Sequence, residues 1–214
     1  FVFDRLVGEE RLRCIGAETG DLLWEKTTPT GYVDMFGYDG GPRASPIVCD
    51  DCVITYGVEG LLVCRRLTDG APKWKVEAGK EFHVVPNFFG VGASPVIYKK
   101  TSGSRGKLVI VQVGGSIPGE TPANPQRLDL VKGLDSGLVA FDIENGREVW
   151  RASSELASYS TPLLHSFGEE VRLLAWMRDH LLLIDPEIGD VKDSFFWRAK
   201  ELFSVVAATP VVLD

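Results

Sequence analysis

The sequence predicts an all-β fold of repeated four-stranded antiparallel units, and two recurring phrases carry this prediction. In the first phrase, a turn glycine precedes a tryptophan by four residues, in the pairs Gly20 and Trp24, Gly70 and Trp74, and Gly146 and Trp150. In the second, a small residue and a hydroxyl residue precede a proline that aliphatic residues follow, at Pro46, Pro95, Pro162 and Pro210. These prolines are 49, 67 and 48 residues apart. Such periods are typical of stacked supersecondary units, none of which can bury its apolar face alone.

Each repeat contains four short stretches with strand character, separated by glycine and aspartate turns. In the clearest repeat, the strands are expected at residues 47–49, 53–56, 61–64 and 73–76. The next two repeats have strands expected at 95–98, 107–113, 138–141 and 148–151, and at 162–164, 171–176 and 180–184 before a divergent last strand. Helical periodicity is weak, and this spacing of strands is that of an antiparallel meander. Such units are the blades of a β-propeller, which leaves only short, protected sheet edges.

The charge and the cysteines limit the class of protein. A net charge of −7 and a pI near 5.1 argue against nucleic acid and anionic membrane surfaces as partners. No apolar run approaches the ~20 residues that span a bilayer. Cys14 and Cys64 each lie six residues before the turn glycine, where later repeats have Ala140 and Leu183, so this position is expected to be a buried packing site.

Cys49 and Cys52 form a CxxC pair around Asp50 and Asp51. This spacing can belong to a redox pair or to half of a zinc site, but no second CxxC and no nearby histidine pair supplies further ligands. The motif falls where the repeat needs a tight hairpin turn. A plain hairpin is therefore favoured, and a strained disulfide across the turn is the alternative.

The turn phrases at residues 17–24 and 142–150, with Ala-Ser-Pro opening the blades, resemble the quinoprotein-type (PQQ-like, BamB-like) β-propeller repeat. The resemblance covers essentially the whole chain. It implies that neighbouring blades dock through six structural residues: Trp24, Trp74, Trp150, Gly20, Gly70 and Gly146. The fourth repeat departs from the pattern, because Asp193 stands where tryptophan is expected, so its last strand is predicted to be shifted or irregular.

The whole chain, residues 1–214, is predicted to be a single, partial propeller. It begins at a second strand and ends on a first strand, and the family usually builds seven or eight blades, so we expect about four blades of a larger ring. The predicted blades lie approximately at residues 1–30, 44–78, 93–153 and 160–198, with 208–214 starting the next one.

Unusual sequence gathers in segments that the blade topology places on one face. These segments are the inter-blade links at 32–43 and 80–92 and a Pro- and Gly-rich insertion at 114–136, which explains the one long repeat interval. Candidate residues for binding a ligand or partner on this face are Tyr38, Asp39, Arg43, His83, Asn87 and Phe89. Arg43 is the strongest candidate, since a charge just before an innermost strand is expected to point toward the central channel. The alternative is that Phe36, Tyr38, Phe88 and Phe89 only plug the propeller mouth.

No catalytic pattern stands out in the sequence. The three histidines are isolated, and neither a phosphate-binding glycine loop nor a GxSxG elbow is present. The first hypothesis is a non-catalytic BamB-like scaffold for protein interaction or ligand recognition, without catalytic residues, metal or cofactor. The resemblance implies a periplasmic or cell-surface location. The alternatives are a quinoprotein dehydrogenase for alcohols or sugars, using PQQ with calcium, and a carbohydrate-binding propeller whose loop-rich face holds a glycan.

Overall fold

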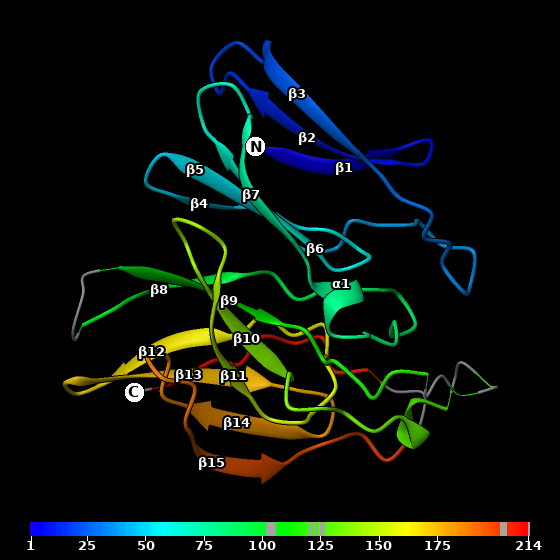
Figure 1. Cartoon of the computed structure of the whole chain (residues 1–214), viewed down its shortest axis with the longest axis vertical. Helices are drawn as coiled ribbons and strands as arrows, with labels where there is room; N and C mark the ends of the chain where they lie inside the picture. Colours follow the sequence, from blue (N-terminus) through cyan, green and yellow to red (C-terminus); the bar gives the residue numbers. More distant parts are fainter. Residues whose placement is uncertain (102–105, 120–121, 123, 125–126, 202–204, 214) are drawn as a thin grey trace.

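A computed structural model describes residues 1–101, 106–119, 122, 124, 127–201 and 205–213, and it contains four antiparallel sheets that follow one another along the molecule (Figure 1). The first sheet consists of β1 (Val2–Leu6), β2 (Glu9–Ile15) and β3 (Leu22–Pro29). The second consists of β4 (Ile47–Cys49), β5 (Cys52–Tyr56), β6 (Leu61–Arg66) and β7 (Pro72–Glu77). The third consists of β8 (Val96–Lys99), β9 (Lys107–Gln112), β10 (Leu138–Asp142) and β11 (Glu148–Ala152). The fourth consists of β12 (Leu163–Phe167), β13 (Glu170–Trp176), β14 (His180–Ile184) and β15 (Val191–Phe196).

Each sheet is a meander in which strands consecutive in the chain are also neighbours in space. The all-β fold of propeller blades predicted from the repeats is therefore confirmed. Two short helical segments, α1 (Ala78–Glu81) and the 3-10 turn η1 (Leu128–Leu130), interrupt the connections. Among the described residues, neither helical segment has the length or the apolar character needed to span a membrane. Residues 205–213, where the sequence suggests the start of another blade, carry no strand, and residue 214 lies outside the described residues.

The expectation of a shifted last strand in the fourth repeat is wrong. β15 pairs with β14 in the register of the other blades, so Asp193 lies opposite Leu183 as Trp74 lies opposite Cys64. The irregularity next to this pair, between Leu183 and Ile184, has counterparts at the same place in the other three sheets. The hydrogen bonds of the strand ladder therefore hold β15 in place without the tryptophan side chain.

The core lies between successive sheets, and the third sheet contributes to both of its main clusters. Along β9, Val109 and Val111 face the second sheet, while Leu108 and Ile110 face the fourth. Side chains of a strand alternate between the two sheet faces, so a strand buried on both sides reads as a continuous apolar run. Blade stacking therefore explains why residues 108–111 are all aliphatic and fully buried.

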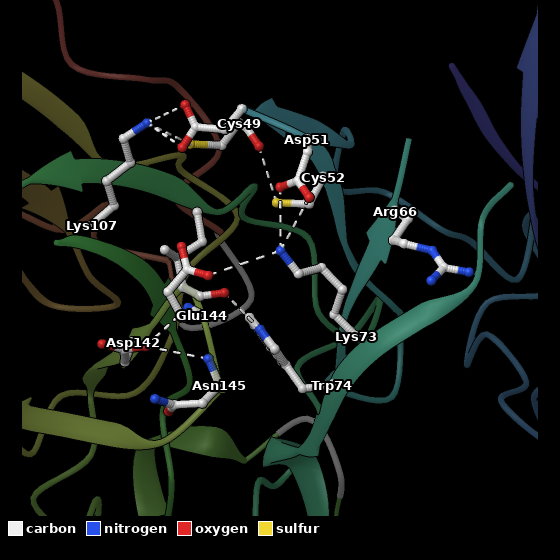
Figure 2. Close-up of polar contacts among 12 residues, drawn as sticks. Cys49, Asp51, Cys52, Arg66, Lys73, Trp74, Lys107, Asp142, Glu144 and Asn145 are labelled. Carbon is white, nitrogen blue, oxygen red and sulfur yellow. Dashed lines mark hydrogen bonds and ion pairs between the residues drawn. The ribbon is translucent and has the colours of Figure 1, made fainter. Parts of the chain in front are cut away.

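Tryptophans on the outermost strands contact the next blade in the same way at three interfaces. The indole N–H groups of Trp24, Trp74 and Trp150 donate to the carbonyls of Leu67, Ile143 and Pro186, at 2.8, 2.7 and 3.2 Å. Each accepting carbonyl lies three residues before a glycine with positive φ: Gly70, Gly146 or Gly189. A Cβ on Gly146 would lie 2.8 Å from the Trp74 ring, so the indole needs a glycine beneath it. Figure 2 shows Trp74 reaching across to the turn that contains Glu144 and Asn145.

Gly20 has the same turn conformation, but no atom lies within 4 Å of its would-be Cβ. No tryptophan therefore covers this turn in the described part of the chain, whereas Gly189, which the tryptophan phrase does not mark, supports Trp150. The first sheet thus contributes a tryptophan to the second, and none of the described residues contributes one to the glycine turn of the first sheet.

The four cysteines are free thiols, including the CxxC pair whose oxidation state the sequence leaves open. Cys49 and Cys52 lie opposite each other across the β4–β5 turn, and the Cys52 thiol donates to the Cys49 carbonyl at 3.1 Å. Lys107 lies 3.4 Å from the Cys49 sulfur and also pairs with Asp50, while burial raises the pKa of the Cys49 thiol (Figure 2). A raised pKa keeps the Cys49 thiol protonated and unreactive, whereas a hydrogen bond with Cys64 lowers the pKa of Cys52. This pair belongs to a plain hairpin in the reduced state.

A buried carboxylate connects the first two blades. The Glu10 side chain accepts a hydrogen bond from the backbone N–H of Val58 at 2.7 Å, and the whole residue is only 5% exposed. Burial raises the pKa of Glu10, with further raising from Glu59 and an opposing effect from the Val58 N–H. A group with this shift binds a proton more readily in the native state than in the unfolded chain.

Replacing Glu10 with glutamine is expected to change how stability depends on pH. Because the folded pKa is raised, the free energy of unfolding of the wild type falls as pH rises from the ordinary carboxyl value through the raised one. The glutamine side chain keeps an oxygen for the Val58 N–H and carries no charge, so Glu10→Gln should be the more stable protein at pH 8, with a smaller advantage near pH 4. Urea denaturation at the two pH values checks this. A loss of stability that is equal at both would contradict it.

Candidate functional site

The links between blades and the loops joining second to third strands lie on one face of the molecule, as the topology predicts. Backbone hydrogen bonds join these segments: Val91 donates to Val58 at 2.8 Å, and Arg178 donates to Leu156 at 3.0 Å. In Figure 1, α1, η1 and the link after β3 all lie on the right. The insertion also belongs to this face, through a bridge between Val84 and Gly115, although residues 120–121, 123 and 125–126 lie outside the described residues. We call this surface the loop-rich face.

Arg43 connects the two inter-blade links. Its guanidinium donates to the carbonyl of Phe89 at 2.7 Å, to the carbonyl of Asp39 at 2.7 Å and to the carboxylate of Asp34 at 2.9 Å. It also lies 5.2 Å from the centre of the Phe89 ring, in cation–π geometry. Arg43 therefore holds the 32–43 loop against the 80–92 link, with 26% of its side chain exposed.

Asp34 organises the same loop, and the sequence reasoning missed it. Its side chain is fully buried, and it accepts hydrogen bonds from the backbone N–H groups of Phe36 at 2.7 Å and Tyr38 at 3.3 Å as well as from Arg43. An aspartate bonded to the N–H two residues later is a common turn former. The signal in the sequence was an aspartate just ahead of an aromatic and glycine-rich stretch.

The two links bring four aromatic rings together, and Tyr159, from the link before β12, adds a fifth. We call these rings the aromatic cluster: Phe36, Tyr38, Phe88, Phe89 and Tyr159. Successive ring centres are 5.7–6.4 Å apart. Phe88 is buried, whereas Phe36 and Tyr38 are 48% and 70% exposed. The inner rings therefore fill the junction between blades, and the two outer rings present an apolar surface to the solvent.

The other candidate residues lie apart from Arg43. His83 is exposed and has a positive φ of 52°; its backbone carbonyl accepts from the Ser116 hydroxyl, and its backbone N–H donates to Lys80. Asn87 bridges to the next link by donating to the Ala157 carbonyl at 3.3 Å. Asp39 is exposed and contacts Arg43 through its backbone. The structure thus places Tyr38, Asp39, Arg43 and Phe89 in one group, with Asn87 further along the same link and His83 outside it.

A cavity of about 460 Å³ opens beside the aromatic cluster. The 80–92 link separates the two, because Asn87 and Gly90 line the cavity while Phe88 and Phe89 join the cluster. The apolar part of the lining includes Val58, Leu61, Val85, Val91, Val113 and Leu156. The polar part includes Glu59, Glu77, Lys75, Lys80, Asn87 and Arg178. A largely apolar hollow with a few polar groups is the usual form of a ligand-binding site.

The described residues around the cavity do not form a calcium site. Among the described residues, no three of His, Cys, Asp and Glu lie close enough together to hold a metal ion. Glu59 is engaged by Thr30 at 2.6 Å, and Glu77 by Lys80 at 2.8 Å. Calcium takes about six to eight oxygen ligands. No step of a quinone-dependent reaction is therefore assigned to these residues.

Comparison with known families agrees with the blade geometry. The model of the family described as outer membrane protein assembly factor BamB matches residues 8–212. The chain belongs to the BamB family. No curated protein matches the chain by sequence.

Solved structures extend the comparison to the fold. BamB from Moraxella catarrhalis superimposes with a TM-score of 0.55 at 16% identity, over 93% of this chain and 48% of that protein. A quinohemoprotein alcohol dehydrogenase from Pseudomonas putida HK5 gives a TM-score of 0.49 at 14% identity, over 88% of this chain and 33% of the enzyme. The chain thus spans about half of the M. catarrhalis protein. At 16% identity, the likeness to the M. catarrhalis protein concerns the fold alone.

Proposed function

We propose that this BamB-family chain is a non-catalytic recognition scaffold whose loop-rich face binds an extended segment of another protein. The observation that carries the proposal is the pairing of two exposed aromatic side chains with an adjoining apolar cavity. Phe36 and Tyr38 stand on a loop that Asp34 and Arg43 brace from within. Aromatic rings held on a rigid support supply contact area without a large entropic cost on binding, which is why they are frequent in recognition surfaces.

The size of the site favours a segment of a protein over a small metabolite alone. The cavity of about 460 Å³ could take one or two side chains, while the aromatic cluster beside it offers an apolar surface outside the cavity. An extended peptide could contact both features at once. We also propose a location in the periplasm or on the cell surface, on the strength of membership of the BamB family.

Selection of random twelve-residue peptides displayed on phage, with the whole chain as bait, tests the proposal. We expect the selected peptides to lose at least tenfold in affinity when Tyr38 or Phe36 is replaced by alanine, about 1.4 kcal/mol or more. The matched control is Phe167→Ala, because Phe167 is similarly exposed, at 46%, but lies at the end of β12 beside the β12–β13 turn, away from the links. Failure to select any peptide, or equal losses in all three variants, would refute a peptide site at the cluster.

Two further titrations separate this proposal from its rivals. Calorimetry with PQQ, with and without Ca²⁺, should give no heat of binding. Tight calcium-dependent binding would instead indicate that the protein is an oxidoreductase and not a scaffold. A glycan array should likewise be silent. A glycan that binds wild type but not Tyr38→Ala would assign the aromatic cluster to carbohydrate instead of protein.

A further inference from the structure

Arg178 is a buried arginine whose charge has no close partner in the described part of the chain. It follows β13, and its side chain is only 10% exposed. Among the described residues, its only charged contact is with the Asp179 carboxylate at 3.9 Å, which is too long for a hydrogen bond. The same Asp179 oxygen already accepts a hydrogen bond from Arg198 at 2.8 Å. No hydrogen-bond acceptor therefore reaches the Arg178 guanidinium from these residues.

The neighbouring acids do not compensate for this. Asp129 and Glu155 attract Arg178 at longer range, yet Asp129 pairs with Arg127 at 2.8 Å and Glu155 with His180 at 2.7 Å. Burial lowers the pKa of Arg178, and the charge of Arg198 lowers it further. A guanidinium has five N–H donors and stays charged, and the Arg178 side chain lines the cavity with donors that no described residue accepts. Such a group points to a ligand that supplies the missing oxygens.

The surroundings of Arg178 indicate the kind of ligand. Arg178 lines the 460 Å³ cavity, and it also lines a narrow recess formed with Asn87, Phe88 and Val205. Aliphatic side chains, among them Val58, Leu61, Val85, Val91, Val113 and Leu156, form one part of the cavity wall, so they can contact an apolar body of the ligand. Guanidinium groups bind both carboxylates and phosphates through paired hydrogen bonds. Glu59 and Glu77 also line the cavity and are balanced by Lys75 and Lys80, so Arg178 leaves the lining with a single net positive charge. One positive charge matches a singly charged carboxylate better than a doubly charged phosphate.

We propose that Arg178 binds a carboxylate attached to an apolar group inside this cavity. Its source is the bound protein segment, through an acidic side chain or a terminal carboxylate; this last step rests on the proposed function, whereas the carboxylate site itself does not. In this arrangement the aromatic cluster contacts an apolar part of the segment outside the cavity. Arg178 binds the carboxylate of the segment inside the cavity and so fixes the position of the segment along the surface.

Stability separates a binding role for Arg178 from a structural one. Because Arg178 gives up no hydrogen bond on replacement, Arg178→Gln should melt at the same temperature as wild type or higher. The matched control is Arg198→Gln at a neighbouring, 14% exposed arginine, which loses its bond to Asp179 and should melt lower. A clear drop in the melting temperature of Arg178→Gln would show that the arginine supports the fold and would overturn the proposal.

Binding is tested with 4-phenylbutyrate, its neutral amide 4-phenylbutyramide and inorganic phosphate, followed by the Nε–H signal of Arg178 in ¹⁵N NMR spectra. We expect the acid to shift this signal and to bind at least tenfold more weakly to Arg178→Gln, with an intermediate affinity for Arg178→Lys. The amide should bind all three proteins alike. Equal affinity of the acid for wild type and Arg178→Gln, or a shift with phosphate in place of the acid, would overturn the carboxylate assignment.

The peptides from phage selection distinguish the two proposals. If 4-phenylbutyrate binds through Arg178 but no peptide is selected, the carboxylate site stands and the protein-recognition role fails. If peptides bind through Tyr38 but are indifferent to Arg178→Gln and to replacement of their own carboxylates by amides, the scaffold stands and the Arg178 site fails.

Discussion

Replacing Trp74 with alanine should lower the free energy of unfolding by about 3–5 kcal/mol, the range usual for a large buried aromatic side chain. Trp74 is 9% exposed and lies in the main cluster between the second and third sheets. Its removal would leave a cavity there and strip the Ile143 carbonyl of the indole N–H at 2.7 Å. Both effects weaken the interface between two blades, so the unfolding transition should also become less cooperative. Urea denaturation followed by circular dichroism measures it.

Two variants make the Trp74 prediction specific. Trp74→Phe keeps most of the buried area and loses the hydrogen bond, so it should lower the free energy of unfolding by about 1 kcal/mol. This variant should stay folded even where Trp74→Ala fails to fold. Trp197→Ala removes a tryptophan that is 57% exposed next to the fourth sheet, and it should cost less than about 1 kcal/mol. Similar losses for Trp74→Ala and Trp197→Ala would contradict a role for Trp74 in holding the blades together.

Gly146→Ala should destabilise the protein by about 2–4 kcal/mol. A φ of 71° disfavours any residue with a Cβ, and the new Cβ would lie 2.8 Å from the Trp74 ring. Overpacking of this kind typically costs about 1–3 kcal/mol. Gly146→Ala therefore disrupts the same contact as Trp74→Ala, but from the third sheet. Chemical denaturation measures the loss in the free energy of unfolding.

Gly20→Ala is the matched control for this second prediction. Its φ of 77° gives the same backbone strain, but the added Cβ would meet no atom within 4 Å. It should therefore cost about 1 kcal/mol, the backbone contribution alone. The difference between the two variants measures the contact with the indole. If both variants lose the same amount, the close approach of Trp74 to Gly146 has no energetic weight.

The arrangement of strands was largely predictable because it depends on local sequence. Glycine and aspartate turns end each strand, and the apolar run at 108–111 is typical of a strand buried on both faces. The strands predicted for the clearest repeat then predict the strands of the other repeats by alignment of the recurring phrases. A wrong expectation concerned β15, where the missing tryptophan at Asp193 suggested an irregular strand. Backbone pairing with β14 holds that strand in register, whereas the tryptophan matters for the contact with a following blade.

The candidate site was predictable only in part. The links at 32–43 and 80–92 stood out because their aromatic and glycine content departs from the repeat, and the topology placed both on one face. The partners within that face were not visible in the sequence. Arg43 was expected to point toward the channel, and the structure engages it with Asp34 and two carbonyls. That Arg43 meets the Phe89 carbonyl depends on how two links pack together, because the two residues are 46 positions apart in the sequence.

The sequence by itself determined the all-β blades, their number within this chain and the glycines and tryptophans of the repeat, because turn formation and strand periodicity act over a few neighbouring residues. Tertiary structure alone decided that Gly146 supports an indole while Gly20, in the same turn conformation, does not. It also decided that the Arg178 side chain, which finds no hydrogen-bond acceptor among the described residues, lines the cavity. Burial, close approach and unpaired charge depend on atoms brought together from different blades, and no local pattern encodes them.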